Sequence, residues 1–313
     1  GQLSTGTPVT PPWAGVGSET RRVTWSAAFG ELGLTVASRE QLFSIGATSR
    51  MLTGGVRSGV LLRVRRDHYA LPSTDLHVLR AVRVGGRLGC TTALRAFGIF
   101  GFESHVTHIH LPRELSRARS PHDRRHHLTR ANRAGTELHW SALLEPEAGS
   151  EVSVGVVDAL AQTVRCSPSH LALASIENAL FLGKVDGAGI ADLFAGLGSE
   201  HQFLRARIDP RSESGQETVL RTALEDAGLR SEIQVLIPGV GRVDGVVEGR
   251  LIWEADSRLA HDGWELHVRD RDRDIDAARL GYMSLRPAYN RTMHRTNEVV
   301  DAIRHLLDST RRP

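Results

Sequence analysis

Three acidic residues in the last third of the chain have the types and the spacing expected of a site for a divalent cation. Glu217 falls in a predicted helix, ETVLRTALEDAGL, and Asp244 and Glu254 fall in a run of three predicted strands, IQVLI, GRVDGVV and RLIWEAD. A tight turn at Glu248-Gly249 would pair position 244 with about position 253, so that Asp244 and Glu254 lie nearly opposite each other. Carboxylates held side by side repel each other unless a cation is present.

A cation bound by these acids would suit the hydrolysis of a phosphodiester bond. Mg²⁺ is bound by one or two carboxylates together with waters and substrate phosphate oxygens, and Mn²⁺ accepts the same kind of oxygen ligands. Such an ion stabilises charge on a phosphodiester oxygen and lowers the pKa of an attacking water. Taken singly, Asp244 is better explained as a turn acid, and Glu254 as an acid exposed at a strand end.

The residues around these acids, 211–307, resemble the very-short-patch-repair-like endonucleases, a branch of the PD-(D/E)XK nuclease superfamily. The matching residues are Glu217 to Leu224 with Gly228 and Leu229; Gln234 and Gly241 to Asp244; Leu251, Ile252, Glu254, Asp256 and His261; Asp270, Arg271, Arg273 and Asp274; and Gly281, Tyr282, Leu285 and Arg286. The resemblance implies a restriction-endonuclease-like α/β domain with a mixed central sheet, which hydrolyses DNA phosphodiester bonds with Mg²⁺ or Mn²⁺.

The resemblance also implies a role for each of the acids. Asp244 and Glu254 would be metal ligands, and Glu217 would complete or support the metal shell from its helix. Gln234, on the first strand, would orient a water or a phosphate.

The resemblance also assigns roles to residues further along the chain, which would activate water or contact phosphate. The superfamily has a lysine two residues after the second acid, and here that position is Asp256. Asp256 or His261 would therefore activate the attacking water. Arg271 and Arg273 would pair with acids of the site or with DNA phosphate. The remainder of the RDRDRDIDAAR run is typical of a solvated helix face.

The basic residues are almost all of one type. Of 39 lysines and arginines, Lys184 is the one lysine, and its surroundings, FLGKVDGAG, lack the glycine spacing of a P-loop. Lysine chemistry at the acidic site is therefore excluded, and any phosphate clamp must be built from arginine. The net charge of +3 is small, so anion binding depends on local patches.

The residues from 24 to 71 have a pattern of three helices followed by a basic hairpin. Ser38 and Gln41 form a predicted capping box, and Thr48 begins the third helix. The stretch resembles the N-terminal winged-helix domain of abortive-infection (type IV) antitoxins in Gln41, Leu42, Gly46, Gly59, Leu62, Arg63, Val64, Arg66, Tyr69, Ala70 and Leu71. The family's wing glycine is replaced here by Asp67 or His68.

This second resemblance implies contact with DNA. A third helix can enter the major groove and arginines can neutralise phosphates, so the expected contacts are Arg50 and Arg57 on the helix and Arg63, Arg65 and Arg66 on the wing. The alternative is that the winged helix mediates protein contacts and the basic hairpin is merely solvated.

The middle of the chain has fewer residues that suggest catalysis or ligand binding. We expect a helix over 76–94, a strand at HVTHIHLP, an exposed basic loop over 113–133 and two apolar helices, the second capped by Ser167. His105, His108 and His110 lie close together in the sequence, but without carboxylate or cysteine support they are a weak metal signal. The two cysteines, Cys90 and Cys166, are expected to form neither a disulfide framework nor a zinc site, which fits a reducing cytoplasm.

Together these patterns predict an α/β protein in four parts. They are a lead-in (1–23), a winged-helix domain (24–75), an antitoxin-like connector with a basic loop (76–205) and a nuclease domain (206–313). The predicted function is that of a metal-dependent DNA endonuclease acting on duplex or single-stranded DNA in repair or defence. The alternative is a catalytically silent, DNA-binding transcriptional regulator. No apolar run is long enough for a membrane span, so we expect a cytoplasmic protein.

Overall fold

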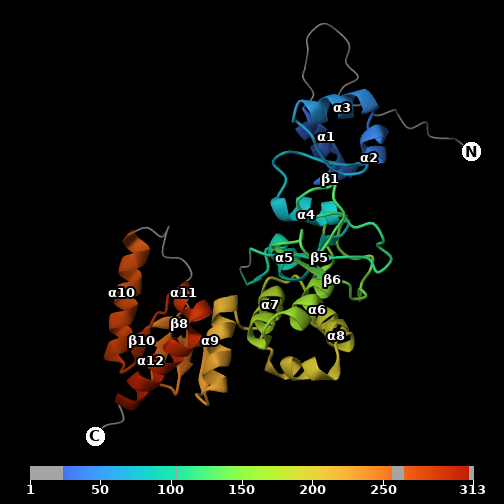
Figure 1. The fold of residues 1–313 in the computed structure, drawn as a ribbon. Helices are drawn as coiled ribbons and strands as arrows, with labels where there is room; N and C mark the ends of the chain where they lie inside the picture. Colours follow the sequence, from blue (N-terminus) through green and yellow to red (C-terminus); the bar gives the residue numbers. More distant parts are fainter. Residues whose placement is uncertain (1–23, 103–104, 256–263, 310–313) are drawn as a thin grey trace, which may run out of the picture. The chain divides into compact units, whose positions relative to one another are not determined.

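The computed structural model describes residues 24–102, 105–255 and 264–309 (Figure 1). The elements in chain order are α1 (Trp25–Leu32), β1 (Val36–Ser38), α2 (Arg39–Ser44), α3 (Ser49–Arg57), β2 (Leu62–Arg65), β3 (His68–Ala70), α4 (Leu76–Val84), β4 (Arg87–Leu88), α5 (Cys90–Ala96), β5 (Thr107–His110), β6 (Thr136–His139), α6 (Val156–Cys166), α7 (Ser169–Phe181), α8 (Gly187–Ala195), the 3₁₀ helix η1 (Ser199–Arg207), α9 (Gly215–Asp226), β7 (Ser231–Ile237), β8 (Gly241–Val247), β9 (Leu251–Trp253), α10 (Trp264–Arg279), β10 (Met283–Leu285), α11 (Tyr289–His294) and α12 (Thr296–Ser309).

The fold is mixed α/β, which is the fold class that the sequence predicts. It divides into two compact units, residues 1–92 with 104–155, and residues 93–103 with 156–313. Within the described residues, no helix combines the length and apolar character that crossing a membrane requires.

The first unit begins with three helices and a three-stranded antiparallel sheet of order β1-β3-β2. The predicted capping box at α2 is confirmed, because Ser38 Oγ accepts from Gln41 N and Gln41 Oε1 accepts from Ser38 N. The turn between β2 and β3 uses Asp67 at φ 58°, a left-handed conformation that aspartate tolerates better than most residues. Aspartate therefore serves at a turn where the resemblance expects glycine.

The expected helix over 76–94 is wrong. Gly85 ends α4 at φ 101°, and the chain then forms β4 before α5 begins at Cys90. A left-handed residue cannot continue a right-handed helix, and glycine adopts this conformation without the steric cost of a Cβ. β4 pairs antiparallel with β5, and β5 pairs parallel with β6.

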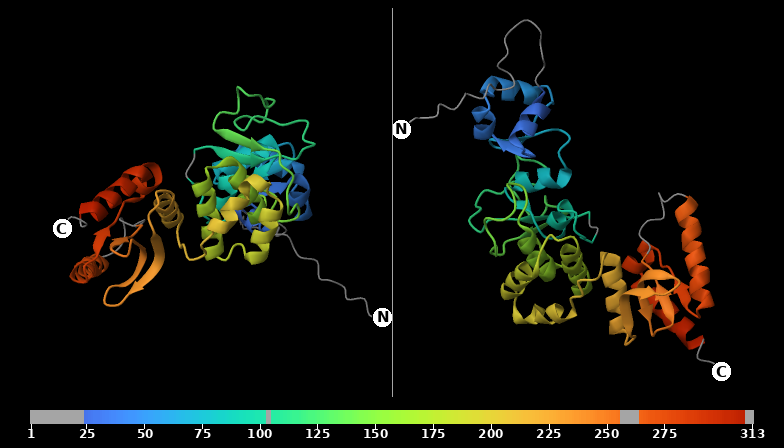
Figure 2. Two further views of the ribbon diagram at one scale, coloured as in Figure 1. Left: turned by 90° about the horizontal axis from the view of Figure 1, so that it is seen from below. Right: turned by 180° about the vertical axis from the view of Figure 1, so that it is seen from behind.

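In the second unit, α6 to η1 precede an α9–β7–β8–β9–α10–β10 segment. Its four strands form one sheet of order β10-β9-β8-β7, in which β10 and β9 are parallel and the other neighbours antiparallel. Leu220 of α9 and Ile303 of α12 share one apolar core with Trp253, and Ala277 of α10 packs with Val243 and Ile252 in another. Helices thus cover both faces of the sheet, which the two views of Figure 2 also show.

Gly245 and Trp253 pack closely against each other in this sheet. Gly245 pairs with Trp253, and a Cβ on Gly245 would lie 2.2 Å from Cε2 of the buried indole. We expect Gly245→Ala to destabilise the protein by about 1–3 kcal/mol, because overpacking displaces neighbouring side chains. Thermal unfolding measures the loss. Gly187→Ala is the matched control, since a Cβ there meets no atom within 4 Å, and equal stability of the two variants would contradict the prediction.

Candidate functional site

Strand register brings three of the predicted site residues into one row. The pairs Ile233↔Gly245 and Val235↔Val243 place Gln234 opposite Asp244. The pair Gly245↔Trp253, continued by one residue, places Asp244 opposite Glu254. The sequence prediction of about position 253 was therefore one residue short. The tight turn is present, with Glu248 at φ 51° and Gly249 at φ 66°.

Glu217 joins this row from α9. Ser214 Oγ caps the helix by accepting from Glu217 N at 3.2 Å. Oε2 of Glu217 accepts from Gln234 Nε2 at 2.8 Å and from Glu213 N at 3.1 Å. The side chain is buried, and burial together with the charge of Asp244 raises the pKa of Glu217 above its usual value.

Asp244 is the second acid of the row and is half-buried. Its Oδ2 accepts from Ala255 N at 2.8 Å, which holds the carboxylate against the end of β9. Burial raises the pKa of Asp244, although the hydrogen bond from Ala255 acts in the opposite direction. Glu217 and Asp244 are therefore neighbouring carboxyl groups that both resist ionisation, and a nearby cation would favour the charged form of each.

Gln234 has two unusual features for a strand residue. Its φ is 53°, a left-handed conformation that is uncommon for a residue with a side chain. Its Nε2 is used by Glu217, but its buried Oε1 has no hydrogen-bond partner among the described residues. A buried acceptor left without a donor costs about 1–3 kcal/mol, and backbone strain of this kind is concentrated at functional sites. Both features point to a polar ligand beside Glu217 and Asp244.

Glu254 is held differently. Its Oε1 accepts from Arg273 Nη2 at 3.0 Å, and its Oε2 pairs with Arg286 Nη1. Arg286 Nη2 also contacts Asp274 Oδ1 at 3.0 Å. Two guanidinium groups thus neutralise the carboxylate that the sequence predicts as a metal ligand.

Among the other predicted site residues, Arg271 is exposed and Arg273 is half-buried in the pair with Glu254. Asp256 and His261 lie outside the described residues. Lys184 is exposed.

Three residues of this site were not predicted to act in it. Glu213 donates its N–H to Glu217 and pairs through Oε1 with Arg242 Nη1 at 2.6 Å, and Arg286 binds Glu254. Glu213 stands four residues before Glu217, but its part in the site depends on the turn before α9, which no motif marked. Arg242 and Arg286 stood in the quoted motifs without a role.

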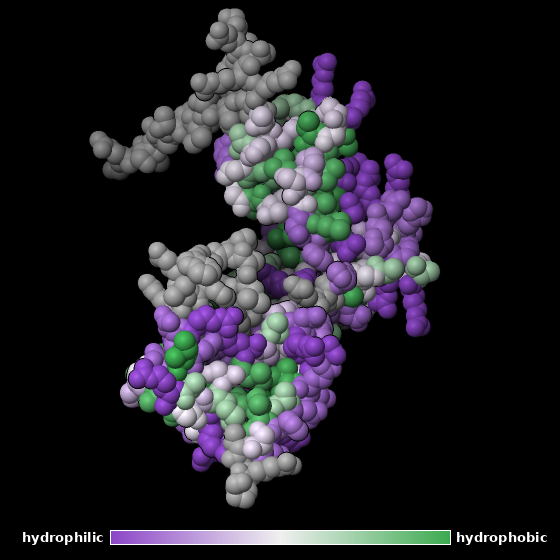
Figure 3. All heavy atoms as spheres, turned by 90° about the vertical axis from the view of Figure 1, so that its left-hand side faces the viewer, coloured by the Kyte–Doolittle hydropathy of each residue, from purple (hydrophilic) through white to green (hydrophobic). Residues whose placement is uncertain are grey.

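The arginines that the winged-helix resemblance implies as DNA contacts lie in the first unit. Arg50, Arg57, Arg63 and Arg66 are exposed, and hydrophilic side chains project from the described surface around smaller hydrophobic patches in Figure 3. Arg65 differs, because its guanidinium lies against Gly85 and is half-buried. Burial and the charge of Arg119 lower the pKa of Arg65. Arg65 is therefore placed as a packing residue of this unit.

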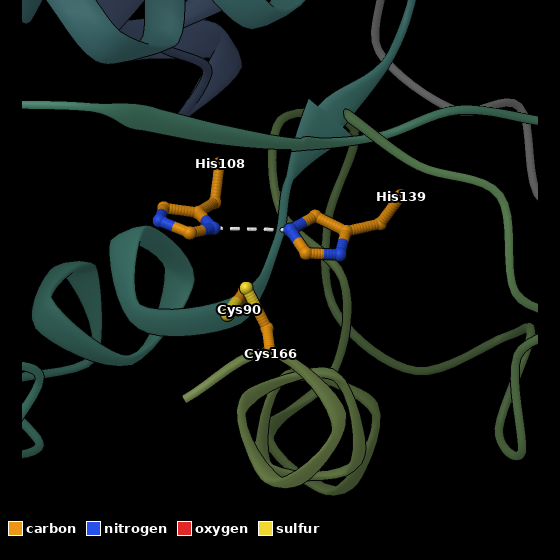
Figure 4. Close-up of side chains that lie close together, drawn as sticks. All are labelled: Cys90, His108, His139 and Cys166. Atoms are coloured by element: carbon orange, nitrogen blue, oxygen red, sulfur yellow. Dashed lines mark hydrogen bonds between the residues drawn. The ribbon is translucent and has the colours of Figure 1, made fainter. Parts of the chain in front are cut away.

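A second group of potential ligands was missed. One ligand atom from each of Cys90, His108 and His139, all in the first unit, lies within 4.8 Å of the others (Figure 4). Among the described residues, Glu217, Asp244 and Glu254 form no such group. The Cys and His residues are a possible metal-binding cluster, and its sulfur and imidazole ligands are not those that select Mg²⁺ or Mn²⁺.

Of the three histidines that are close together in the sequence, only His108 belongs to this group. His105 is exposed, and His108 and His110 are two apart on β5 with a residue between them. The ring that meets His108 is His139, which lies on β6 and is 31 positions away in the chain. Burial, Arg87 and His139 lower the pKa of His110 to about 4, so His110 is neutral at pH 7.

No family model matches this sequence. A search of curated proteins finds no match either.

Proposed function

We propose that the second unit is a metal-dependent endonuclease that hydrolyses DNA phosphodiester bonds. The observation that carries the proposal is the row of Gln234, Asp244 and Glu254 across three neighbouring strands, with Glu217 hydrogen-bonded to Gln234. The order α9–β7–β8–β9–α10–β10, with its mixed sheet, supports the resemblance to the PD-(D/E)XK superfamily.

The residues present fit a hard divalent cation. Glu217 offers a buried carboxylate and Asp244 a half-buried one, and Gln234 offers a buried amide oxygen without a hydrogen-bond partner among the described residues. Mg²⁺ and Mn²⁺ prefer oxygen ligands. Asp244, Glu254 and Glu217 would hold the ion, which when bound polarises phosphate oxygens and lowers the pKa of an attacking water.

The chain's own side chains would complete the site. Gln234 Oε1 would accept a hydrogen bond from the attacking water and orient it toward phosphorus. Arg273 and Arg286 present guanidinium groups at Glu254, and a planar fork is suited to a phosphate oxygen pair as well as to a carboxylate. Asp256 or His261 would take the proton of the water, as the resemblance implies.

The test is cleavage of supercoiled plasmid and of labelled single-stranded DNA by the full chain, with Mg²⁺, with Mn²⁺ and with EDTA. We expect nicked or linear plasmid with either metal and intact plasmid with EDTA. Plasmid that is bound but stays supercoiled under all three conditions would overturn the proposal.

A specific observation favours a second function, that of a catalytically silent DNA-binding regulator. The carboxylate of Glu254 is paired with Arg273 and Arg286, and a carboxylate neutralised in this way has less attraction for a cation. Binding without cleavage in the plasmid test, together with sequence-selective retention of duplex fragments, would establish this second function.

Either function requires DNA contact, for which we propose a winged helix in the first unit. Arg50 on α3 and Arg63 on β2 are exposed. We expect the double variant Arg50→Ala/Arg63→Ala to bind duplex DNA more weakly and to reduce the slope of log K against log salt by about 0.9 for each lost phosphate contact. Fluorescence anisotropy over a salt series measures this slope. Exposed Arg205 on η1 supplies the control, Arg205→Ala, and identical slopes for all three proteins would exclude contact by these arginines.

A further inference from the structure

We propose that Cys90, His108 and His139 of the first unit bind a Zn²⁺ ion. This site is separate from the acidic row of the proposed nuclease and uses none of its residues.

The three ligands of the first unit carry the argument. His108 Nδ1 and His139 Nε2 face each other at 3.0 Å, and their rings stack with centroids 5.3 Å apart at 20° (Figure 4). Cys90 is fully buried, and its ligand atom lies within 4.8 Å of those of both histidines. With Zn–N near 2.1 Å and Zn–S near 2.3 Å, tetrahedral coordination separates ligand atoms by about 3.3–3.8 Å. Side-chain shifts of the order of 1 Å would close the shell.

The local backbone supports each ligand. Cys90 begins α5 in a left-handed conformation, with φ 49°, which is unusual for cysteine. His108 N donates to Thr92 Oγ1 at 3.0 Å, which ties β5 to the first turn of α5. The parallel pairing of β5 with β6, including His110↔His139, brings His139 beside β5. The ligands therefore lie on ordered helix and strand positions, which suits a preorganised site.

Charge and ligand type select the metal. One thiolate and two neutral imidazoles around a divalent ion give a site with a net charge of +1, which is less costly to bury than the bare ion. Thiolate with imidazole is a ligand set that suits zinc, and three protein ligands leave the fourth tetrahedral position to a water or a further ligand. The ion would thus stabilise the fold by linking β5, β6 and the start of α5.

The experiment measures metal in the full-length, untagged chain, produced with zinc and purified without chelator. We expect about one zinc per chain by elemental analysis and a lower melting temperature after chelation. Cobalt substitution should give the absorption bands of a tetrahedral site and a thiolate-to-metal charge-transfer band. Protein without bound zinc, whose melting temperature does not change when zinc is added, would overturn the proposal.

Variants separate the built site from adventitious binding. His139→Ala and Cys90→Ser should lose most of the zinc, whereas His139→Cys, which keeps a ligand, should retain it. His127→Ala is the control, because His127 is exposed and lies outside the cluster. If Cys90→Ser does not fold, His139→Cys provides the test, since a second thiolate should strengthen the charge-transfer band. An unchanged band in His139→Cys, or unchanged zinc content in His139→Ala, would refute the three-ligand site.

Discussion

Replacing Asp244 by asparagine is expected to reduce metal-dependent DNA cleavage by about 10³-fold or more, because the cation would lose a charged ligand. A loss of several kcal/mol of metal or transition-state stabilisation corresponds to this factor at 1.36 kcal/mol for each tenfold change. The change is nearly isosteric. An asparagine oxygen can still accept the hydrogen bond that Ala255 N now donates to Asp244 at 2.8 Å. The end of β9 should therefore keep its position.

The stability of this variant should move in the opposite direction from its activity. Burial raises the pKa of Asp244, so its ionised form is disfavoured in the folded protein, and removing the charge relieves that cost. Without added metal, we expect the melting temperature of Asp244→Asn at neutral pH to equal or exceed that of the wild type, as is common where a site is kept at the expense of stability. Asp301→Asn, at an exposed position on α12, is the control. Undiminished cleavage by Asp244→Asn would remove Asp244 from the site.

The largest expected loss of stability comes from the buried ion pair between α7 and α9. Glu177 Oε1 and Arg221 Nη2 are 2.6 Å apart, and their side chains are 0% and 5% exposed. Glu177 also accepts from Asp209 N and Thr218 Oγ1. Arg221→Met leaves a buried carboxylate without its cation, which costs about 3–5 kcal/mol. The melting temperature should fall by roughly 10 °C.

The effect should depend on pH in a definite direction. Burial raises the pKa of Glu177 above 4.5 even with Arg221 present, and loss of Arg221 removes the main influence that lowers it. The folded variant then binds a proton more readily than the unfolded chain, so its stability falls as pH rises from 4.5 through the raised pKa. Chemical unfolding at pH 4 and pH 8 measures this difference. Glu177→Gln/Arg221→Met should recover part of the loss at pH 8, and an equal deficit at both values would contradict the prediction.

Much of the local structure followed from residue patterns. The helix caps at Ser38 and Thr48 are present, because a side-chain oxygen placed before a helix satisfies a nearby backbone N–H. The turns at Asp67 and Glu248 are also where the sequence places them. These features depend on neighbours a few positions apart, and that information is contained in the local sequence.

Local patterns failed where a single backbone conformation decided the outcome. The apolar residues of 76–94 have helical spacing, yet Gly85 at φ 101° separates α4 from β4. The helix expected to be capped by Ser167 has Pro168 as its cap and begins at Ser169. Neither conformation is encoded in hydrophobic spacing, because glycine and proline act on the backbone itself.

By itself the sequence determined that lysine chemistry at the acidic site is excluded and that the chain is mixed α/β. It also placed Gln234 and Asp244 on consecutive strands and Glu254 at the end of the next. The tertiary structure decided which charges meet. It joined Glu217 to Gln234, turned Glu254 toward Arg273 and Arg286, and brought His139 to His108 and Cys90. The physical reason is that a site depends on atoms within a few ångströms of one another. Strand register and helix packing set those distances between residues that lie far apart in the chain.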